Sequence, residues 1–266
     1  MEDSLTYDLT AWALPYVYGI DAYAVAKTLA AGDQPDILSF QPNTKGDTLP
    51  YAYLVPWHDL QQVQFLAALL KANIQVRYTK EPLHRGHQAH PPGTLIIARA
   101  DNPVLGDKLD DQLIEIANRL EQPLLPIRSG WMTEGKDLGS SALPLIKSPK
   151  VALLAGAGVS TTDLGAIWHY FEQDLQFPLH ILNKTNANAV DLHQFDVLIL
   201  VSGKYDDLKT QLFQFAQQGG KIIAIEDAVS LIADDRSSLI HKNFEKMKEN
   251  QEKAEGEPGP NDEKLT

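Results

Sequence analysis

The chain has 266 residues and a mass of 29.4 kDa, which is enough for two modest domains. Its net charge of -12 disfavours binding to a nucleic-acid backbone, and its lack of cysteine excludes disulfides, thiolate metal sites and a cysteine nucleophile. No apolar run reaches the roughly 18 residues that cross a bilayer, so no membrane span is expected.

Residues 1–48 form an aromatic-rich N-terminal segment. Residues 1–20 lack the basic and apolar regions of a secretory signal. Within a dozen positions they carry Tyr7, Trp12, Tyr16 and Tyr18. Aromatic side chains at this density usually pack against other apolar groups, so we expect them to contact either the following domain or a preceding one.

Residues 49–148 predict a first α/β domain, because short apolar runs alternate with helix-length amphipathic segments. The expected strands are 51–56, 74–79, 94–99 and 124–127, and the expected helices are 58–72 and 109–120. A domain junction is predicted in 128–149, which is rich in glycine and proline and has little periodicity.

In residues 149–236, predicted strands and helices alternate more regularly than in the first domain, which predicts a second α/β domain. The expected strands are 150–155, 179–182, 196–201 and 221–225, and the expected helices are 162–174, 206–217 and 228–233. Thr161 or Thr162 is expected to cap the first of these helices. We therefore predict two three-layer α/β domains with mostly parallel sheets, the second doubly wound and flavodoxin-like. Residues 237–266 are charged and low in apolar residues, which predicts a disordered tail.

Two sets of residues have metal-ligand spacing. His84, His87 and His90 are three residues apart, but the neighbouring glycine and prolines favour a solvent-facing loop over a metal site. His169 and Glu172 have the His-x-x-Glu spacing of a zinc pair, but without a third ligand they are interpreted as helix-surface residues. No metal-binding residue is therefore assigned.

Other candidate residues follow predicted strands. Gly156 and Gly158 lie in a strand-to-helix turn, but a third glycine and the acidic partner of a dinucleotide site are missing. A turn without ligand is favoured, with a nucleotide or anion site as the alternative. Ser202 also follows a strand, but no Gly-x-Ser-x-Gly elbow surrounds it, so it is interpreted as a turn residue. No catalytic or cofactor-binding residue is assigned.

Several segments resemble the C-terminal extension of bacterial zinc carboxypeptidases of the carboxypeptidase A-like class. The similar segments are 3–24, 91–102, 153–172, 168–182 and 195–205. The resemblance implies that the peptidase domain, with its zinc, precedes this chain and is absent from it. His169 and Glu172 match the zinc pair in spacing only, so no peptidase residue is carried over. Export to the periplasm or cell envelope is a further implication of the resemblance.

The last domain resembles a class I glutamine amidotransferase-like fold. Glu226 stands where active members carry their cysteine, which implies a degenerate domain that serves as a scaffold or binding module. Another role for Glu226 or Asp227 is kept as an alternative. In the family the domain resumes after the charged low-complexity segment, so the chain is expected to be a fragment.

Two functions remain. The first is a non-catalytic accessory or binding region of a zinc carboxypeptidase-family protein, with the missing peptidase domain and a peptide or small molecule as partners. The second is a small-molecule-binding or hydrolytic α/β enzyme with a pocket at the carboxyl ends of the second domain's strands, surrounded by Gly156, Gly158, Ser202 and Glu226.

Overall fold

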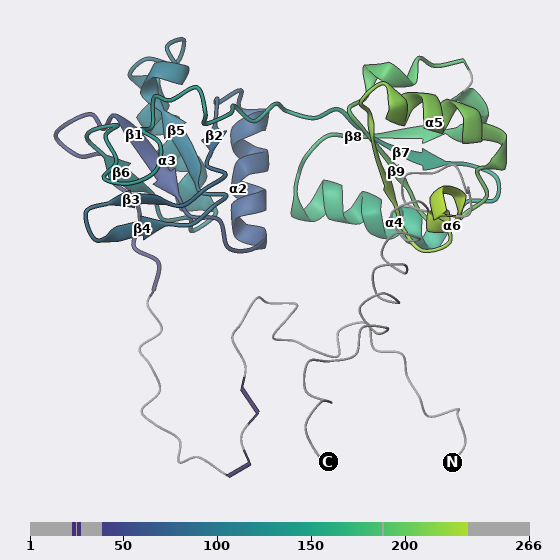
Figure 1. The fold of residues 1–266 in the computed structure, drawn as a ribbon, viewed down its shortest axis with the longest axis horizontal. Coiled ribbons are helices and arrows are strands. Elements are labelled where there is room, and N and C mark those ends of the chain that lie inside the picture. Colours follow the sequence, from purple (N-terminus) through teal and green to yellow (C-terminus); the bar gives the residue numbers. More distant parts are fainter. Residues whose placement is uncertain (1–22, 25, 28–38, 188, 234–266) are drawn as a thin grey trace, which may run out of the picture. The chain divides into compact units, whose positions relative to one another are not determined.

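The computed structural model describes residues 23–24, 26–27, 39–187 and 189–233, which form two compact units (Figure 1). The first unit ends at Ser148 and also includes Leu175–Phe177, and the rest of the chain from Pro149 onward belongs to the second. The predicted packing of the four N-terminal aromatic residues and the predicted disordered tail lie outside the described residues.

The first unit contains a four-stranded sheet in the order β2-β5-β1-β6. Its strands are β1 (Ala52–Val55), β2 (Arg77–Tyr78), β5 (Leu95–Ala98) and β6 (Leu125–Ile127), and its helices are α2 (Leu60–Lys71) and α3 (Lys108–Arg119). All three strand pairs are antiparallel, with Tyr53 opposite both Ile97 and Pro126. Helix α2 connects β1 to β2 and α3 connects β5 to β6, each crossing over one intervening strand, which is a split β-α-β arrangement.

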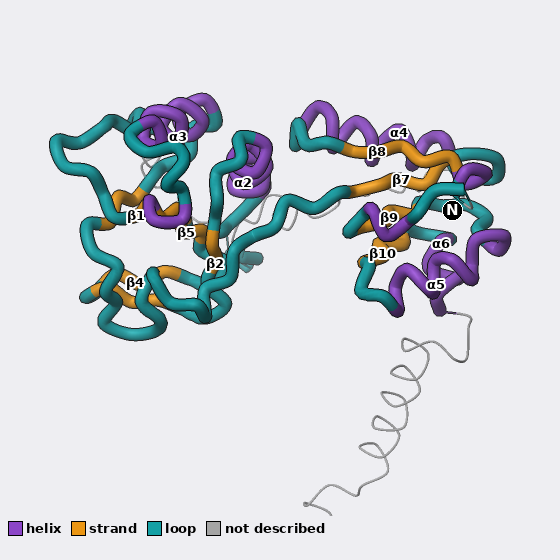
Figure 2. The backbone as a smooth tube through the Cα atoms, turned by 90° about the horizontal axis from the view of Figure 1, so that it is seen from above, coloured by secondary structure: helices purple, strands orange, loops and turns teal. Residues whose placement is uncertain are grey.

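Helices α2 and α3 cover the same face of this sheet (Figure 2). Helix α2 begins in a capping box, because the Asp59 side chain accepts from the Gln62 main-chain amide and the Gln62 side chain accepts from the Asp59 main-chain amide. The Asp59 side chain also accepts from the Gln61 amide. The core on this face includes Tyr53 and Val55 from β1, Phe65 from α2 and Leu113 from α3. Each fully buried large apolar side chain contributes about 1.5–3 kcal/mol.

The opposite face is covered by a hairpin and a long loop rather than by helices. The hairpin consists of β3 (Leu83–Arg85) and β4 (Gln88–His90), and residues 128–148 bring three buried apolar side chains to the sheet: Met132, Leu138 and Leu143. Arg77 holds this loop, because its guanidinium donates to both carboxylate oxygens of Asp101 and to the Leu143 carbonyl, each at 2.7 Å. The predicted junction segment is therefore part of the first unit's core.

The predicted mostly parallel sheet is wrong for the first unit. Strands β1 and β2 run in the same direction, as a helical crossover requires. However, β5 lies between β1 and β2 and runs antiparallel to both of them. The link from β2 to β5 holds the β3–β4 hairpin instead of a helix. Apolar periodicity identified these strands but carries no information about their direction.

A buried carboxylate joins β1 to α3 in this unit. Asp110 is 1% exposed, and it accepts two hydrogen bonds of 2.7 Å from Arg99 and one of 2.6 Å from the Tyr53 hydroxyl. Burial acts to raise the pKa of Asp110, but the bonds from Arg99 and Tyr53 outweigh it and hold that pKa below its usual value. Burial and the bond to Asp110 raise the pKa of the Tyr53 phenol.

The second unit contains a fully parallel sheet in the order β10-β9-β7-β8, which confirms the prediction of a parallel sheet here. Its strands are β7 (Val151–Ala155), β8 (Leu179–Asn183), β9 (Val197–Leu200) and β10 (Lys221–Ala224), and its helices are α4 (Thr161–His169), α5 (Lys209–Gln217) and α6 (Ala228–Ala233). Helices α4 and α5 lie on opposite sides of the sheet (Figure 1).

The start of α4 differs from the prediction. Ser160 is the N-cap residue, since its hydroxyl accepts from the Asp163 amide, and the helix begins at Thr161. At its other end α4 continues into a π-helical turn at Tyr170–Asp174. Short 3-10 turns occupy Lys184–Asn186 and Leu192–Gln194 on the way from β8 to β9, and the described residues of this connection form no α-helix.

Candidate functional site

The second unit has a pocket at the carboxyl ends of its strands. From β7 the chain continues to β8 on one side of the sheet, and from β9 it continues to β10 on the other side, so the strand order reverses direction between β7 and β9. The pocket has a volume of about 480 Å³. It is lined after β7 by Gly158 and Ser160, after β9 by Ser202, Gly203, Lys204, Tyr205 and Asp206, and after β10 by Asp227, Ser230 and Leu231.

Backbone hydrogen bonds hold the loops after β7 and β9 against each other. The Ser160 amide donates to the Ser202 carbonyl at 2.8 Å, and the Lys204 amide donates to the Gly158 carbonyl at 3.0 Å. Gly203 is required for this approach, because a Cβ atom there would lie 2.9 Å from the Gly158 carbonyl oxygen. Two walls of the pocket are therefore fixed by main-chain contacts.

Serine hydroxyls and carboxylates supply the polar chemistry of the pocket. The Ser202 hydroxyl donates to Asp227 Oδ2 at 3.0 Å, which links the loop after β9 to the start of α6. The Ser230 hydroxyl donates to the Asp227 main-chain carbonyl at 2.7 Å. With Lys204 as the cation and Asp206 and Asp227 as anions, the charged lining is net negative.

Two buried side chains support the loop after β9 from below. The Tyr205 hydroxyl donates to the Val201 carbonyl at 2.8 Å, and burial raises the pKa of Tyr205 to about 12, so this phenol remains protonated. The Lys184 ammonium, at the end of β8, donates to the Lys204 carbonyl at 2.8 Å and lies 3.5 Å from Asp207. Lys184 is 8% exposed, so its charge serves the loop rather than the pocket.

The structure brings two of the four predicted pocket residues together. Gly158 and Ser202 line the pocket, but Gly156 and Glu226 do not, and Asp227 occupies the position expected for Glu226. Gly156 instead faces the end of β8, where a Cβ would lie 2.7 Å from Asn183 Oδ1. Glu226 has a left-handed backbone with φ of 54°, and the carboxylate that reaches Ser202 is that of the next residue.

The histidine candidates are spread over separate environments. His84 and His90 lie on opposite strands of the hairpin and His87 in its turn, which corrects the predicted loop. His90 is 3% exposed, and its Nε2 has no hydrogen-bond partner in the described part of the chain. His84 Nδ1 lies 3.4 Å from a Glu134 carboxylate oxygen.

The His-x-x-Glu pair lies at the end of α4. His169 is the last residue of the helix, and both His169 and Glu172 are exposed. Within the ranges that the structure describes, no three histidine, aspartate or glutamate side chains are grouped so that they could hold a metal ion.

Sequence reasoning missed Lys204, Asp206, Asp227 and Ser230 as pocket residues. The signal was available for the first two, because Ser202 to Asp206 form a polar run directly after a buried strand, and such runs at the carboxyl ends of parallel strands converge on one edge. Ser230 carries no such signal, since it lies inside a short helix.

Comparison with known proteins found no match to any family model, curated protein or solved structure. Among the helices that the structure describes, none is long and apolar enough to cross a membrane.

Proposed function

We propose that this chain is a non-catalytic accessory or binding region of a zinc carboxypeptidase-family protein, and that its second unit binds a small, neutral, hydroxyl-rich ligand. The observation that carries the binding role is the pocket after β7, β9 and β10, which lies where parallel α/β sheets take their ligands. The proposed partner is the peptidase domain, and the proposed location is the periplasm or cell envelope.

The strand order supports the finer fold assignment. Counting β7 to β10 as first to fourth gives the order 2-1-3-4, which is that of a doubly wound, flavodoxin-like sheet. The amidotransferase-like resemblance leads to the same class of sheet. In this proposal the domain is a degenerate member, with Glu226 at the turn where active members hold a cysteine.

The lining favours binding over acyl transfer. A serine nucleophile needs a base that accepts its proton near neutral pH, usually histidine. Ser202 instead donates to the Asp227 carboxylate, and no histidine is among the described residues that line the pocket. The same pair presents hydrogen-bonding oxygens to a ligand hydroxyl.

The charge of the lining selects the ligand class. Asp206 and Asp227 outnumber Lys204, so a phosphate or dinucleotide would meet like charge. Sugar hydroxyls both donate and accept, which suits serine hydroxyls and carboxylate oxygens together. A neutral saccharide is therefore the proposed ligand class.

Binding is tested by titrating the ¹⁵N-labelled full chain with N-acetylglucosamine and maltose, with NAD as the anionic comparison. We expect saturable amide shifts at Ser160, Ser202 and Gly203 with a sugar, and none there with NAD. Asp227→Asn should weaken binding about tenfold, whereas Glu172→Gln, an exposed carboxylate change in the same unit, should leave it unchanged. Absence of sugar-dependent shifts at these residues would contradict the proposed ligand class.

The enzyme alternative is supported by the same pocket and makes a different prediction. A thermal-shift screen of metabolites should then identify a substrate that the chain turns over, and Asp227→Ala or Ser202→Ala should abolish turnover. If no metabolite stabilises the chain and Asp227→Ala changes no activity, this alternative fails.

A further inference from the structure

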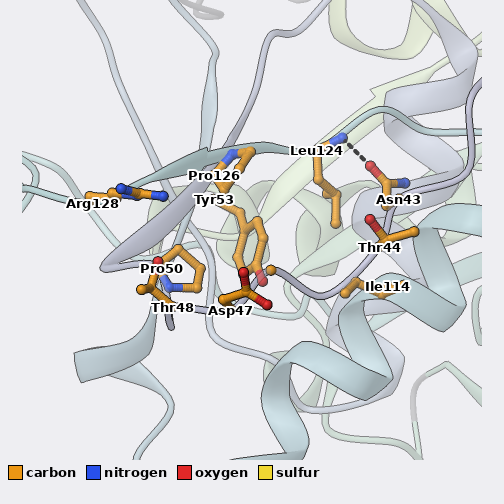
Figure 3. Close-up of a pocket in the computed structure, with 11 residues that line it drawn as sticks. Asn43, Thr44, Asp47, Thr48, Pro50, Tyr53, Ile114, Leu124, Pro126 and Arg128 are labelled. Atoms are coloured by element: carbon orange, nitrogen blue, oxygen red, sulfur yellow. Dashed lines mark hydrogen bonds between the residues drawn. The ribbon is translucent and has the colours of Figure 1, made fainter.

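The first unit contains a pocket of its own, with a volume of about 430 Å³ (Figure 3). It lies between the segment 43–50 and three elements of the fold. Its lining comes from that segment (Asn43, Thr44, Gly46, Asp47, Thr48, Pro50), from β1 (Tyr53), from α3 (Ile114), and from β6 and its flanks (Leu124, Pro126, Arg128). This volume falls within the range of about 300–1,000 Å³ typical of small-molecule sites.

The wall formed by residues 43–50 is held by Asn43. Its side-chain amide donates to Asn118 Oδ1 at 2.9 Å and to the Gln122 carbonyl at 2.9 Å, while its Oδ1 accepts from the Leu124 amide at 2.8 Å. The main chain of Asn43 also exchanges two hydrogen bonds with the Asn118 side chain. The pocket is therefore largely formed before a ligand arrives.

Two further contacts hold the segment 43–50, at Lys45 and at Pro50. The Lys45 ammonium lies 2.9 Å from Asp111 on α3, and the Arg99 side chain donates to the Pro50 carbonyl at 3.3 Å. Between these two anchors lies Asp47, whose carboxylate is thereby presented at the pocket.

Two opposite charges line the pocket without neutralising each other. Arg128 and Asp47 have no ion pair or hydrogen bond within the described chain, and they are too far apart to pair directly. Figure 3 shows Arg128 to one side of Tyr53 and Pro126, with Asn43 and Ile114 to the other side. Both charges are exposed, so each is available to a ligand.

The rest of the lining is mainly apolar. Ile114, Leu124, Pro50 and Pro126 contribute aliphatic surface. Tyr53 contributes its ring, because its hydroxyl already donates to the buried Asp110. A ligand with an apolar group finds a surface to cover here.

We propose that this pocket binds a small zwitterion of the free α-amino-acid class with an apolar side chain. The Arg128 guanidinium would pair with the α-carboxylate, for which its planar fork is well suited. The Asp47 carboxylate would pair with the α-ammonium group, and the apolar side chain would cover Ile114, Leu124 and Pro126. A simple anion would satisfy Arg128 but meet repulsion from Asp47, and a simple cation would meet the reverse.

Titration of the ¹⁵N-labelled full chain with L-leucine tests this site. Because both charged residues are solvent-exposed, we expect a dissociation constant in the range of about 1–10 mM and saturable amide shifts at Thr44, Asp47, Thr48 and Arg128. N-acetyl-leucine, which lacks the ammonium group, and leucinamide, which lacks the carboxylate, should each bind about tenfold more weakly.

Matched variants separate recognition from folding. Arg128→Gln and Asp47→Asn should each weaken L-leucine binding about tenfold, while the exposed control changes Arg119→Gln and Asp107→Asn leave it within about twofold. Unchanged amide spectra outside the pocket show that each variant is folded.

Three outcomes would overturn the proposal. They are an absence of shifts up to about 20 mM L-leucine, equal binding of leucinamide, and equal binding of N-acetyl-leucine. These readouts lie on the first unit, so their failure is distinct from a failure of the saccharide site on the second unit.

Discussion

Asp110 shows how a single residue fixes part of the first unit. Its charge is removed from water and compensated by Arg99 and by the Tyr53 hydroxyl. Arg99→Met should lower the free energy of unfolding by about 3–5 kcal/mol, because a buried carboxylate then loses its counter-charge. Tyr53→Phe should cost less, about 1.5–3 kcal/mol, since Arg99 remains.

Urea unfolding of these two variants measures the difference. The surface control Arg119→Met should stay within about 0.5 kcal/mol of the wild type. If Arg99→Met behaves like this control, the Asp110 charge is not held as described.

The buried His90 predicts that the folding stability depends on pH below about pH 6.5. Burial, together with Arg85 and His84, lowers the pKa of His90 below its usual value of 6.5, so the folded state favours the neutral ring. The unfolded chain then binds more protons in this window, and the stability due to neutral His90 is complete above about pH 6.5. It is lost progressively as the pH falls from there toward the lowered folded pKa.

Unfolding free energies measured between about pH 7.5 and pH 5 check this sign. His90→Gln should reduce the slope of stability against pH, and His87→Gln, an exposed change in the same hairpin, should leave the slope intact. An unchanged slope in His90→Gln would remove His90 as the cause.

At the scale of elements, the turn between β10 and α6 holds Glu226 in a strained conformation. Its φ of 54° lies in the left-handed region, where a side chain is unfavourable and glycine is not. Glu226→Gly should therefore raise stability, by up to about 1 kcal/mol. Ala224→Gly, in the neighbouring strand, should lower it by about 0.5–1 kcal/mol, and thermal unfolding of the pair compares them. A destabilised Glu226→Gly would show that its side chain is needed in the turn.

Element boundaries were largely predictable from apolar periodicity, but strand direction and layer composition were not. The helix expected at 109–120 is found at Lys108–Arg119, whereas the strand expected at 74–79 is reduced to Arg77–Tyr78. The β3–β4 hairpin was read as a loop, because three-residue strands carry no periodicity. Antiparallel pairing in the first sheet depends on which strands meet, and local sequence does not encode this.

The candidate site follows the same pattern. Gly158 and Ser202 were predictable as pocket residues, because each follows a continuous apolar run that is typical of a buried parallel strand. Glu226 was predicted to line the pocket, but Asp227 does so instead. The left-handed backbone at Glu226 determines which of the two carboxylates reaches Ser202, and the sequence does not indicate this backbone conformation. The first unit's pocket was not predicted at all, because Asp47 and Arg128 are 81 positions apart in the sequence and neither lies in a motif.

In the whole molecule, the two units are each compact and each has buried apolar side chains of its own, which predicts separate responses to mutation. Arg99→Met should lower the stability of the first unit only. Gly203→Ala should lower that of the second only, because its Cβ would lie 2.9 Å from the Gly158 carbonyl oxygen. Hydrogen exchange of assigned amides reports both, and loss of protection across both units from either change would contradict this division.

The proposal of a non-catalytic region is tested most directly by the zinc content of the purified full chain after dialysis, measured alongside the release of C-terminal amino acids from peptides. We expect that zinc is removed by dialysis and that no amino acid is released above the protein-free control. One zinc ion retained per chain, with release of C-terminal amino acids, would contradict it.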